Sequence, residues 1–295
     1  MVLAREGSHY RVHTEQGPVR AALSGKMKRG APKVVVGDRV HLEGGGGGDL
    51  FGIVAVEPRT SVLDRRVPQG RGTRPVAANI DQVFVVTSST QPAPVPSVLD
   101  RLLVIAEANE LAASVIVNKA DLDPGDALVA RFILAGYPVL ATSTKTRQGL
   151  EELRRRLQGR VTVVTGPSGA GKSSLVNAVQ PGLSLRVGEV SARNRRGTNT
   201  TVSAVMLPLD GGGFLVDTPG FSDVGIWGLD PRELASCFPE MRPFIGRCRF
   251  GDCRHVSEPG CAVLAAAAEG VVAADRLESY HLLLQDTEGE PKEWE

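Results

Sequence analysis

The stretch that decides the fold runs from residue 161 to residue 179 and reads Val-Thr-Val-Val-Thr-Gly-Pro-Ser-Gly-Ala-Gly-Lys-Ser-Ser-Leu-Val-Asn-Ala-Val. Residues 161–164 form an apolar run that predicts a strand, and residues 172–179 have helical spacing. The segment between them fits G-x-x-x-x-G-K-[ST], in which glycines let backbone N–H groups wrap around phosphate oxygens at a helix N-terminus. This stretch therefore predicts an α/β fold with a phosphate-binding loop.

Within this loop each residue type has a chemical role. Lys172 is expected to reach the β- and γ-phosphates of a bound nucleotide, and the Ser173 hydroxyl is expected to ligate Mg²⁺. The predicted nucleotide-binding residues of the loop are Gly166, Pro167, Ser168, Gly169, Ala170, Gly171, Lys172, Ser173 and Ser174.

Strands and helices alternate on both sides of this loop. Strands are predicted at 80–87, 115–117, 139–141, 202–209 and 213–216, and helices at 98–113, 128–135 and 150–157. This alternation predicts a mostly parallel, doubly wound sheet covered on both faces, in a domain of about residues 76–236.

The first 75 residues have a different pattern. Short strands are predicted at 10–12, 19–23, 34–42 and 51–57, which indicates a small barrel or sandwich. This region has 13 Lys and Arg against 7 Asp and Glu, although the whole chain has a net charge of only +1. The local excess points to nucleic acid as a partner, with solvated surface charge as an equal alternative. The candidate contacts are Lys26, Lys28, Arg29, Arg59, Arg65 and Arg66, with Arg195 and Arg196 further along the chain.

A base-reading segment is predicted directly after the strand at 115–117. It reads Asn118-Lys119-Ala120-Asp121. The Asp121 carboxylate only accepts hydrogen bonds, which suits the N1–H and N2 donors of guanine and not the edge of adenine. Ser143 and Thr144 follow the next strand and are further candidates, although a plain polar loop is an equal alternative there.

Two switch segments are predicted later in the chain. Asp217-Thr-Pro-Gly220 follows a strand, so Asp217 is expected to hold Mg²⁺ and Gly220 to offer its N–H to the γ-phosphate. Thr201, or its neighbour Thr200, is expected to complete the Mg²⁺ shell only while the γ-phosphate is present. These motifs occur in permuted order, because the base-reading segment precedes the phosphate loop and the switches come last.

Three cysteines and a histidine form a second cluster near residue 250. The spacing Cys248-x4-Cys253-x-His255-x5-Cys261 gives four ligands that suit a closed, tetrahedral and structural Zn²⁺ site. A set of buried thiols with an unrelated histidine is the alternative. Cys237 lies outside the spacing and is expected to be a small core residue. Helical segments are predicted at 262–268 and 275–285.

Taken together, these motifs resemble the ribosome small-subunit-dependent GTPase A family over essentially the whole chain. The resemblance rests on Asn79-Ile-Asp-Gln-Val, Leu99-Asp-Arg, the three nucleotide motifs and the string from Cys248 to Cys261. It implies an OB-fold at 1–75, a circularly permuted GTPase domain at 76–236 and a zinc-binding domain at 237–295. It also implies GTP hydrolysis stimulated by the 30S subunit, late maturation of that subunit and contact with 16S rRNA.

One position departs from the family pattern. Asn199 stands where the family usually has a histidine before the switch threonines. An amide can orient a water molecule but cannot titrate, so Asn199 is expected to position the attacking water, with a plain loop residue as the alternative. A nucleotide-gated rRNA adaptor with negligible hydrolysis is therefore the alternative to an active GTPase; a GTPase acting on tRNA or at a membrane is a weaker one. We expect a cytoplasmic protein, since no apolar run nears the roughly 20 residues of a membrane span. We also expect a monomer, since the sequence has no visible dimer signature.

Overall fold

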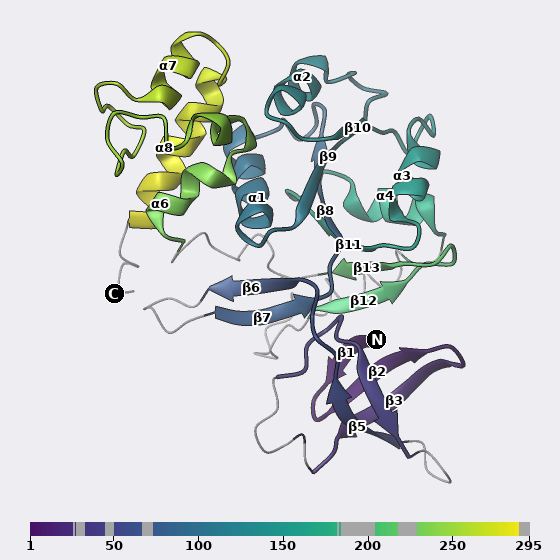
Figure 1. The fold of residues 1–295 in the computed structure, drawn as a ribbon. Helices are drawn as coiled ribbons and strands as arrows, with labels where there is room; N and C mark the ends of the chain where they lie inside the picture. Colours follow the sequence, from purple (N-terminus) through teal and green to yellow (C-terminus); the bar gives the residue numbers. More distant parts are fainter. Residues whose placement is uncertain are drawn as a thin grey trace, which may run out of the picture.

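The computed structural model describes residues 1–25, 27, 33–44, 50–66, 73–181, 183, 204–217 and 229–288. Figure 1 shows a small β-sheet at the N-terminal end, a larger sheet flanked by helices, and a C-terminal group of helices beside it. Among the described residues, no helix combines the length and apolar character needed to cross a bilayer.

Five short strands form the N-terminal sheet. They are β1 (Val2–Glu6), β2 (His9–Thr14), β3 (Gly17–Leu23), β4 (Val40–Glu43) and β5 (Leu50–Val56). Their order is β1-β2-β3-β5-β4, with β3 and β5 parallel. Two backbone bonds, Val2 N to Asp38 O and Gly37 N to Val2 O, tie β1 to the segment that leads into β4. This partly closed five-stranded arrangement confirms the predicted OB-fold.

The strand predicted at 34–42 forms only in its last part. Residues 34–36 are buried, but Val36 makes only an isolated bridge to Ala77, and β4 begins at Val40. A turn at Gly37 and Asp38 interrupts the run, because the Asp38 carboxylate accepts a bond from Val35 N. The hairpin of β6 (Val62–Arg66) and β7 (Thr73–Ala78) follows and was not predicted.

The central sheet has six strands in the order β10-β9-β8-β11-β13-β12. They are β8 (Gln82–Ser88), β9 (Ala112–Asn118), β10 (Val139–Ala141), β11 (Val161–Thr165), β12 (Val205–Pro208) and β13 (Phe214–Asp217). All neighbouring pairs are parallel except β12 with β13. The predicted mostly parallel sheet is therefore confirmed, and its parallel strands end at one edge.

Four helices cover this sheet: α1 (Pro96–Ala108), α2 (Asp126–Leu134), α3 (Leu150–Leu157) and α4 (Lys172–Val179). The predicted helix at 98–113 ends early, at Ala108. There the Asn109 side chain bonds to Ile105 O and Glu110 takes a positive φ of 56°, so the chain turns at once into β9.

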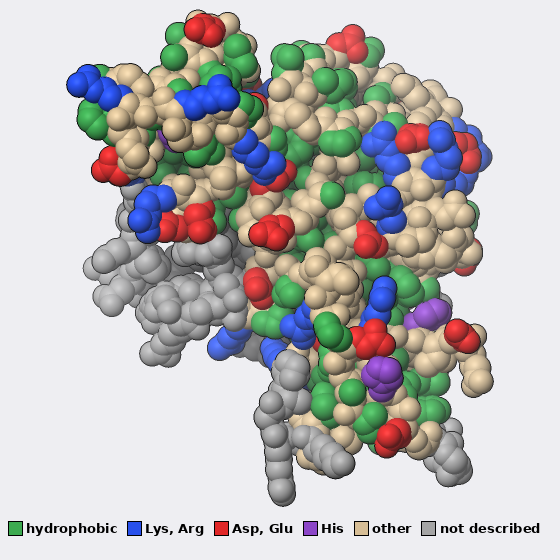
Figure 2. All heavy atoms as spheres, viewed as in Figure 1, with side chains coloured by type: hydrophobic (Ala, Val, Ile, Leu, Met, Phe, Trp, Pro, Cys, Tyr) green, Lys and Arg blue, Asp and Glu red, His purple; other side chains and the backbone are tan. Residues whose placement is uncertain are grey.

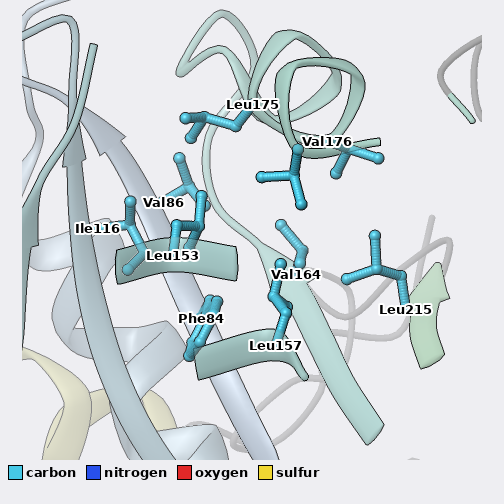
Figure 3. A pocket seen from close by; sticks show the side chains of 10 residues that line it. Phe84, Val86, Ile116, Leu153, Leu157, Val164, Leu175, Val176 and Leu215 are labelled. Carbon is cyan, nitrogen blue, oxygen red and sulfur yellow. The ribbon is translucent and has the colours of Figure 1, made fainter. Parts of the chain in front are cut away.

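Apolar side chains hold α3 and α4 against the sheet. Figure 3 shows Leu153 and Leu157 of α3 and Leu175 and Val176 of α4 around a small apolar cavity that Phe84 and other strand residues also line. Both helices therefore have a fixed position over the sheet. This packing holds the start of α4 at the carboxyl end of β11.

The C-terminal part is short of strands, as its sequence predicts. It contains α6 (Pro231–Leu234), the 3₁₀ turns η2 (Ala235–Cys237) and η3 (Pro239–Phe244), α7 (Ala262–Ala268) and α8 (Ala274–Glu288). Helix α8 packs against α1 and α6, and the Phe238 and Tyr280 rings meet edge to face at 5.5 Å. The C-terminal helices are therefore joined to the central sheet through α1 (Figure 1).

Candidate functional site

The phosphate loop lies between β11 and α4, as predicted. Lys172 bends back over the loop, and its ammonium donates to Gly166 O at 2.7 Å and Pro167 O at 2.9 Å. Gly166 has a φ of +140°, and a Cβ there would lie 1.9 Å from Val86 O, so only glycine fits beside β8. The loop backbone is therefore shaped by local glycines and by the neighbouring strand.

A pocket at this loop brings together three predicted ligands, Lys172, Ser173 and Asp217. Burial raises the pKa of Asp217, with Lys172 opposing that change, and burial lowers the pKa of Lys172, with Asp217 opposing it. Both charged forms are thus disfavoured by desolvation. A phosphate beside Lys172 and a cation beside Asp217 would each stabilise the charged form of that side chain.

The base-reading segment occupies the end of β9. Asn118 is buried, and its side-chain oxygen accepts a bond from the Thr142 hydroxyl at 3.3 Å. The Ser143 hydroxyl donates to the Asp121 carboxylate at 2.6 Å and so orients it. Ala120 N donates to Thr142 O at 3.0 Å, which ties this segment to the loop after β10.

The two loops meet although 52 residues separate Asn118 from Ala170. The Asn118 amide donates to Ala170 O at 3.0 Å, and the Lys119 ammonium donates to Gly169 O at 3.0 Å. Gly171 follows at a φ of +89°, where a Cβ would lie 2.3 Å from the Asn118 amide nitrogen. A single pocket can therefore present phosphate-binding and base-reading groups side by side.

One more segment borders this pocket and was not among the predicted site residues. The Lys119 ammonium also donates to Gln91 O, Pro92 packs 3.1 Å from a Cβ position at Gly169, and the Ser89 hydroxyl donates to Lys119 O. The sequence did contain a signal for this segment, namely a Pro-rich loop directly after a buried strand. Carboxyl ends of parallel strands share one edge of the sheet, so such a loop lies beside the other two loops.

The remaining predicted nucleotide-site residues have different outcomes. Thr144 lies in the described turn after β10, beside Ser143. Asn199, Thr201 with its alternative Thr200, and Gly220 lie outside the described residues.

Cys248, Cys253, His255 and Cys261 converge in the C-terminal part. Their ligand atoms all lie within 4.8 Å of one another; Cys248 Sγ is 3.5 Å from His255 Nδ1 and 3.9 Å from Cys261 Sγ. A tetrahedral ion with thiolates at ~2.3 Å needs sulfur atoms about 3.8 Å apart, so the four side chains fit a metal ion.

Backbone bonds support this cluster. Arg254 N, Val256 N and Ser257 N donate to the Glu258 carboxylate at 2.8–3.0 Å, and these bonds close the loop around His255. Burial acts to raise the pKa of Glu258, but the backbone bonds outweigh it and lower that pKa to about 2. The ligand loop is therefore tied to a carboxylate that stays ionised.

Comparison with known proteins identifies the family. The sequence model of the RsgA GTPase family matches residues 56–227. The chain is 47% identical to a small ribosomal subunit biogenesis GTPase RsgA of Gemmatimonas aurantiaca, covering 98% of this chain and 97% of the relative. It is 39% identical to the protein of the same name from Moorella thermoacetica, covering 97% and 96%.

Two solved structures share the fold. The crystal structure of YjeQ from Thermotoga maritima matches with a TM-score of 0.80 at 34% identity, covering 98% of both chains. YloQ, described as a circularly permuted GTPase, matches with a TM-score of 0.78 at 24% identity. The match covers 99% of this chain and 96% of YloQ, and at this identity it supports the fold alone. The predicted motif order and the predicted resemblance are confirmed, and the chain belongs to the RsgA GTPase family.

Proposed function

We propose that this member of a GTPase family binds guanine nucleotides in the pocket between the phosphate loop and the base-reading segment, hydrolyses GTP there, and acts in maturation of the small ribosomal subunit. The observation that carries the nucleotide part is the pair of contacts from Asn118 to Ala170 O and from Lys119 to Gly169 O. They join two loops that a guanine nucleotide would have to bridge, with its phosphates at one and its base at the other.

Selectivity for guanine comes from Asp121. Its carboxylate accepts the two N–H donors of the guanine edge, while the hydroxyl of Ser143 holds it in orientation. Asn118 acts indirectly, because its amide bonds hold the base-reading segment against the phosphate loop. Ala120 and Thr144 complete the base-binding set through their position in the two loops.

On the phosphate side, Lys172 leaves its carbonyl partners and turns to the β- and γ-phosphates. Ser173 and Asp217 hold Mg²⁺, which neutralises phosphate charge when bound. Thr201 and Gly220 are proposed to respond to the γ-phosphate, and Asn199 to orient the attacking water. These last three assignments rest on the sequence pattern.

The ribosomal part of the proposal rests on the names of the relatives, which are small ribosomal subunit biogenesis GTPases. We propose that this chain acts late in maturation of the 30S subunit, as a cytoplasmic monomer in contact with 16S rRNA. On the face seen in Figure 2, basic and acidic side chains lie interspersed over α3 and over the C-terminal helices. RNA contact is assigned to the N-terminal module because residues 1–75 have an excess of Lys and Arg.

One candidate for RNA contact has a different role. The Arg59 guanidinium binds the fully buried Asp38 carboxylate at 2.7 and 2.9 Å and donates to Lys33 O at 2.8 Å. It therefore braces the turn before β4 instead of facing a phosphate. Lys26, Lys28 and Arg29, with Arg195 and Arg196, lie outside the described residues, and the side chains of Arg65 and Arg66 are not described either.

We further propose that Zn²⁺ is the ion of the Cys248, Cys253, His255 and Cys261 cluster, because three thiolates and one imidazole suit it and leave no open position. Metal binding then replaces apolar core in a short segment. The division into domains at 1–75, 76–236 and 237–295 is likewise proposed.

The test is nucleotide binding and hydrolysis by the purified chain and by Asp121→Asn. We expect the wild type to bind GDP and not ADP, and Asp121→Asn to lose GDP and gain xanthosine diphosphate, because an amide offers a donor to the oxygen that replaces the N2 amine. Asp126→Asn is the matched control, since Asp126 lies exposed at the start of α2. Equal binding of ADP and GDP by the wild type would refute the site.

Hydrolysis is tested by phosphate release with and without purified 30S subunits. Stimulation by 30S subunits is the expected result. GTP-dependent binding to 30S subunits without phosphate release would instead favour the nucleotide-gated adaptor, and no effect of the subunit on binding or turnover would remove the ribosomal part.

A further inference from the structure

We propose that a buried charge cluster between α1, α2 and α8 positions the base-reading segment, so that the C-terminal helices control how tightly the chain holds a guanine nucleotide. The cluster consists of Asp100, Arg131, Glu240, Asp275 and Arg276. This inference rests on the proposed guanine site and adds positioning residues that do not touch the nucleotide.

Asp100 of α1 is the centre of the cluster. Its side chain is 0% exposed, and it accepts bonds from both terminal nitrogens of Arg131, at 2.9 and 2.8 Å. Arg276 of α8 donates to the same carboxylate at 2.6 Å. One buried carboxylate therefore links α1, which packs on the central sheet, to both α2 and α8.

The two arginines have further partners on the C-terminal side. Arg276 is 1% exposed, donates to Glu240 of η3 and stacks over the Phe238 ring at 4.6 Å. Arg131 donates to Asp275, whose side chain is half-exposed at the start of α8. Helix α2 is thus held by α8 both directly, through Asp275, and indirectly, through Asp100.

Such a cluster specifies geometry more than it adds stability. Buried ion pairs are often no more stabilising than apolar side chains of the same volume, because desolvation offsets the attraction. Planar guanidinium groups that bind a carboxylate through two bonds do fix the orientation of their partners. The cluster therefore sets the angle and height of α2 against α1 and α8.

A short series of hydrogen bonds links α2 to the base-reading segment. Val129 N in α2 bonds to Gly125 O, Gly125 N to the Asp123 carboxylate at 2.7 Å, and Leu122 N to Lys119 O at 2.9 Å. The same Lys119 reaches Gly169 O in the phosphate loop. A shift of α2 would consequently act on residues 119–122, the turn closed by the Leu122 N to Lys119 O bond, and this turn contains Asp121.

The test measures the rate of GDP release and the affinities for GDP and ADP. It compares the full-length wild type with Arg131→Met at a temperature well below unfolding. We expect Arg131→Met to release GDP on the order of tenfold faster and to discriminate less between GDP and ADP. Asp275→Asn removes only the exposed partner and should give a smaller change in the same direction. It also preserves the test if Arg131→Met does not fold.

Arg101→Met is the matched control, because Arg101 pairs with Asp286 and so links α1 to α8 without contacting Arg131. It should change GDP release by less than about twofold. Unchanged GDP release in Arg131→Met and Asp275→Asn, or an equal change in Arg101→Met, would overturn the inference while the guanine site stands. Absence of GDP binding by the wild type would overturn both.

Discussion

Replacing Gly171 by alanine is the sharpest perturbation of the contact between the two nucleotide loops. Gly171 has a φ of +89°, and a Cβ there would lie 2.3 Å from the Asn118 amide nitrogen, well inside contact distance. Asn118 must then move or the phosphate loop must open. Either response breaks the bond from Asn118 to Ala170 O that holds the loops together.

Two costs add up in this variant. An alanine in the left-handed region costs about 1–2 kcal/mol. Loss of the bond between Asn118 and Ala170 O adds about 1 kcal/mol. The empty loop can relax to avoid these costs, but a nucleotide-bound loop cannot. The free energy of GDP binding should therefore become less favourable by about 2–3 kcal/mol. At ~1.4 kcal/mol per tenfold, GDP affinity should fall on the order of 30- to 140-fold.

Isothermal titration of GDP into both proteins measures this change, with thermal unfolding recorded alongside. Gly159→Ala is the matched control, because Gly159 has a φ of +68° with nothing within 4 Å of its Cβ position. It has similar backbone strain, and its GDP affinity should stay at the wild-type value. If Gly171→Ala binds GDP as tightly as the wild type, then the contact between the loops does not shape the site.

Three further predictions concern other parts of the molecule. Burial acts to raise the pKa of Asp100, but the bonds from Arg131 and the charge of Arg276 outweigh it and lower that pKa. The stability that Asp100 adds is present above its unfolded pKa of ~4 and is lost as the pH falls from there through its lower folded pKa, so denaturant unfolding should show wild type and Asp100→Asn differing at pH 7 and converging at pH values well below 4. Cys253→Ser should reduce bound metal from about one ion per chain to almost none by elemental analysis, whereas Cys237→Ser should keep it. Asn199→Ala should lower 30S-stimulated phosphate release and leave GTP affinity intact; unchanged release would exclude a catalytic role.

Cys237→Ser is a suitable control for the metal prediction because of where Cys237 lies. Its side chain is buried, it donates weakly to Glu233 O, and burial raises the pKa of its thiol to about 11. A thiol in that state does not compete for the ion. Loss of metal in Cys237→Ser would therefore contradict the assignment of the four ligands.

Much of the architecture could be predicted because its signals are local. Helices α3, α4 and α7 have the predicted bounds, since apolar periodicity and flanking glycines define them within the segment itself. The end of α1 could not be predicted, because the turn at Asn109 and Glu110 depends on a side-chain bond that hydrophobic periodicity does not encode. The hairpin of β6 and β7 was missed for another reason: Pro75 lies inside β7, where a proline argues against a strand, and charged residues end β6.

By itself, the sequence determined which chemical groups this protein has and in what order. The spacing from Gly166 to Ser173 and from Cys248 to Cys261 places each set of groups within one short piece of chain, where covalent geometry limits their distances. Only the tertiary structure decided that Asn118 meets Ala170, that Arg59 serves Asp38, and that Arg131 and Arg276 share Asp100. Those contacts join residues 21 to 176 positions apart, so they depend on strand order and helix packing, which a single sequence does not specify.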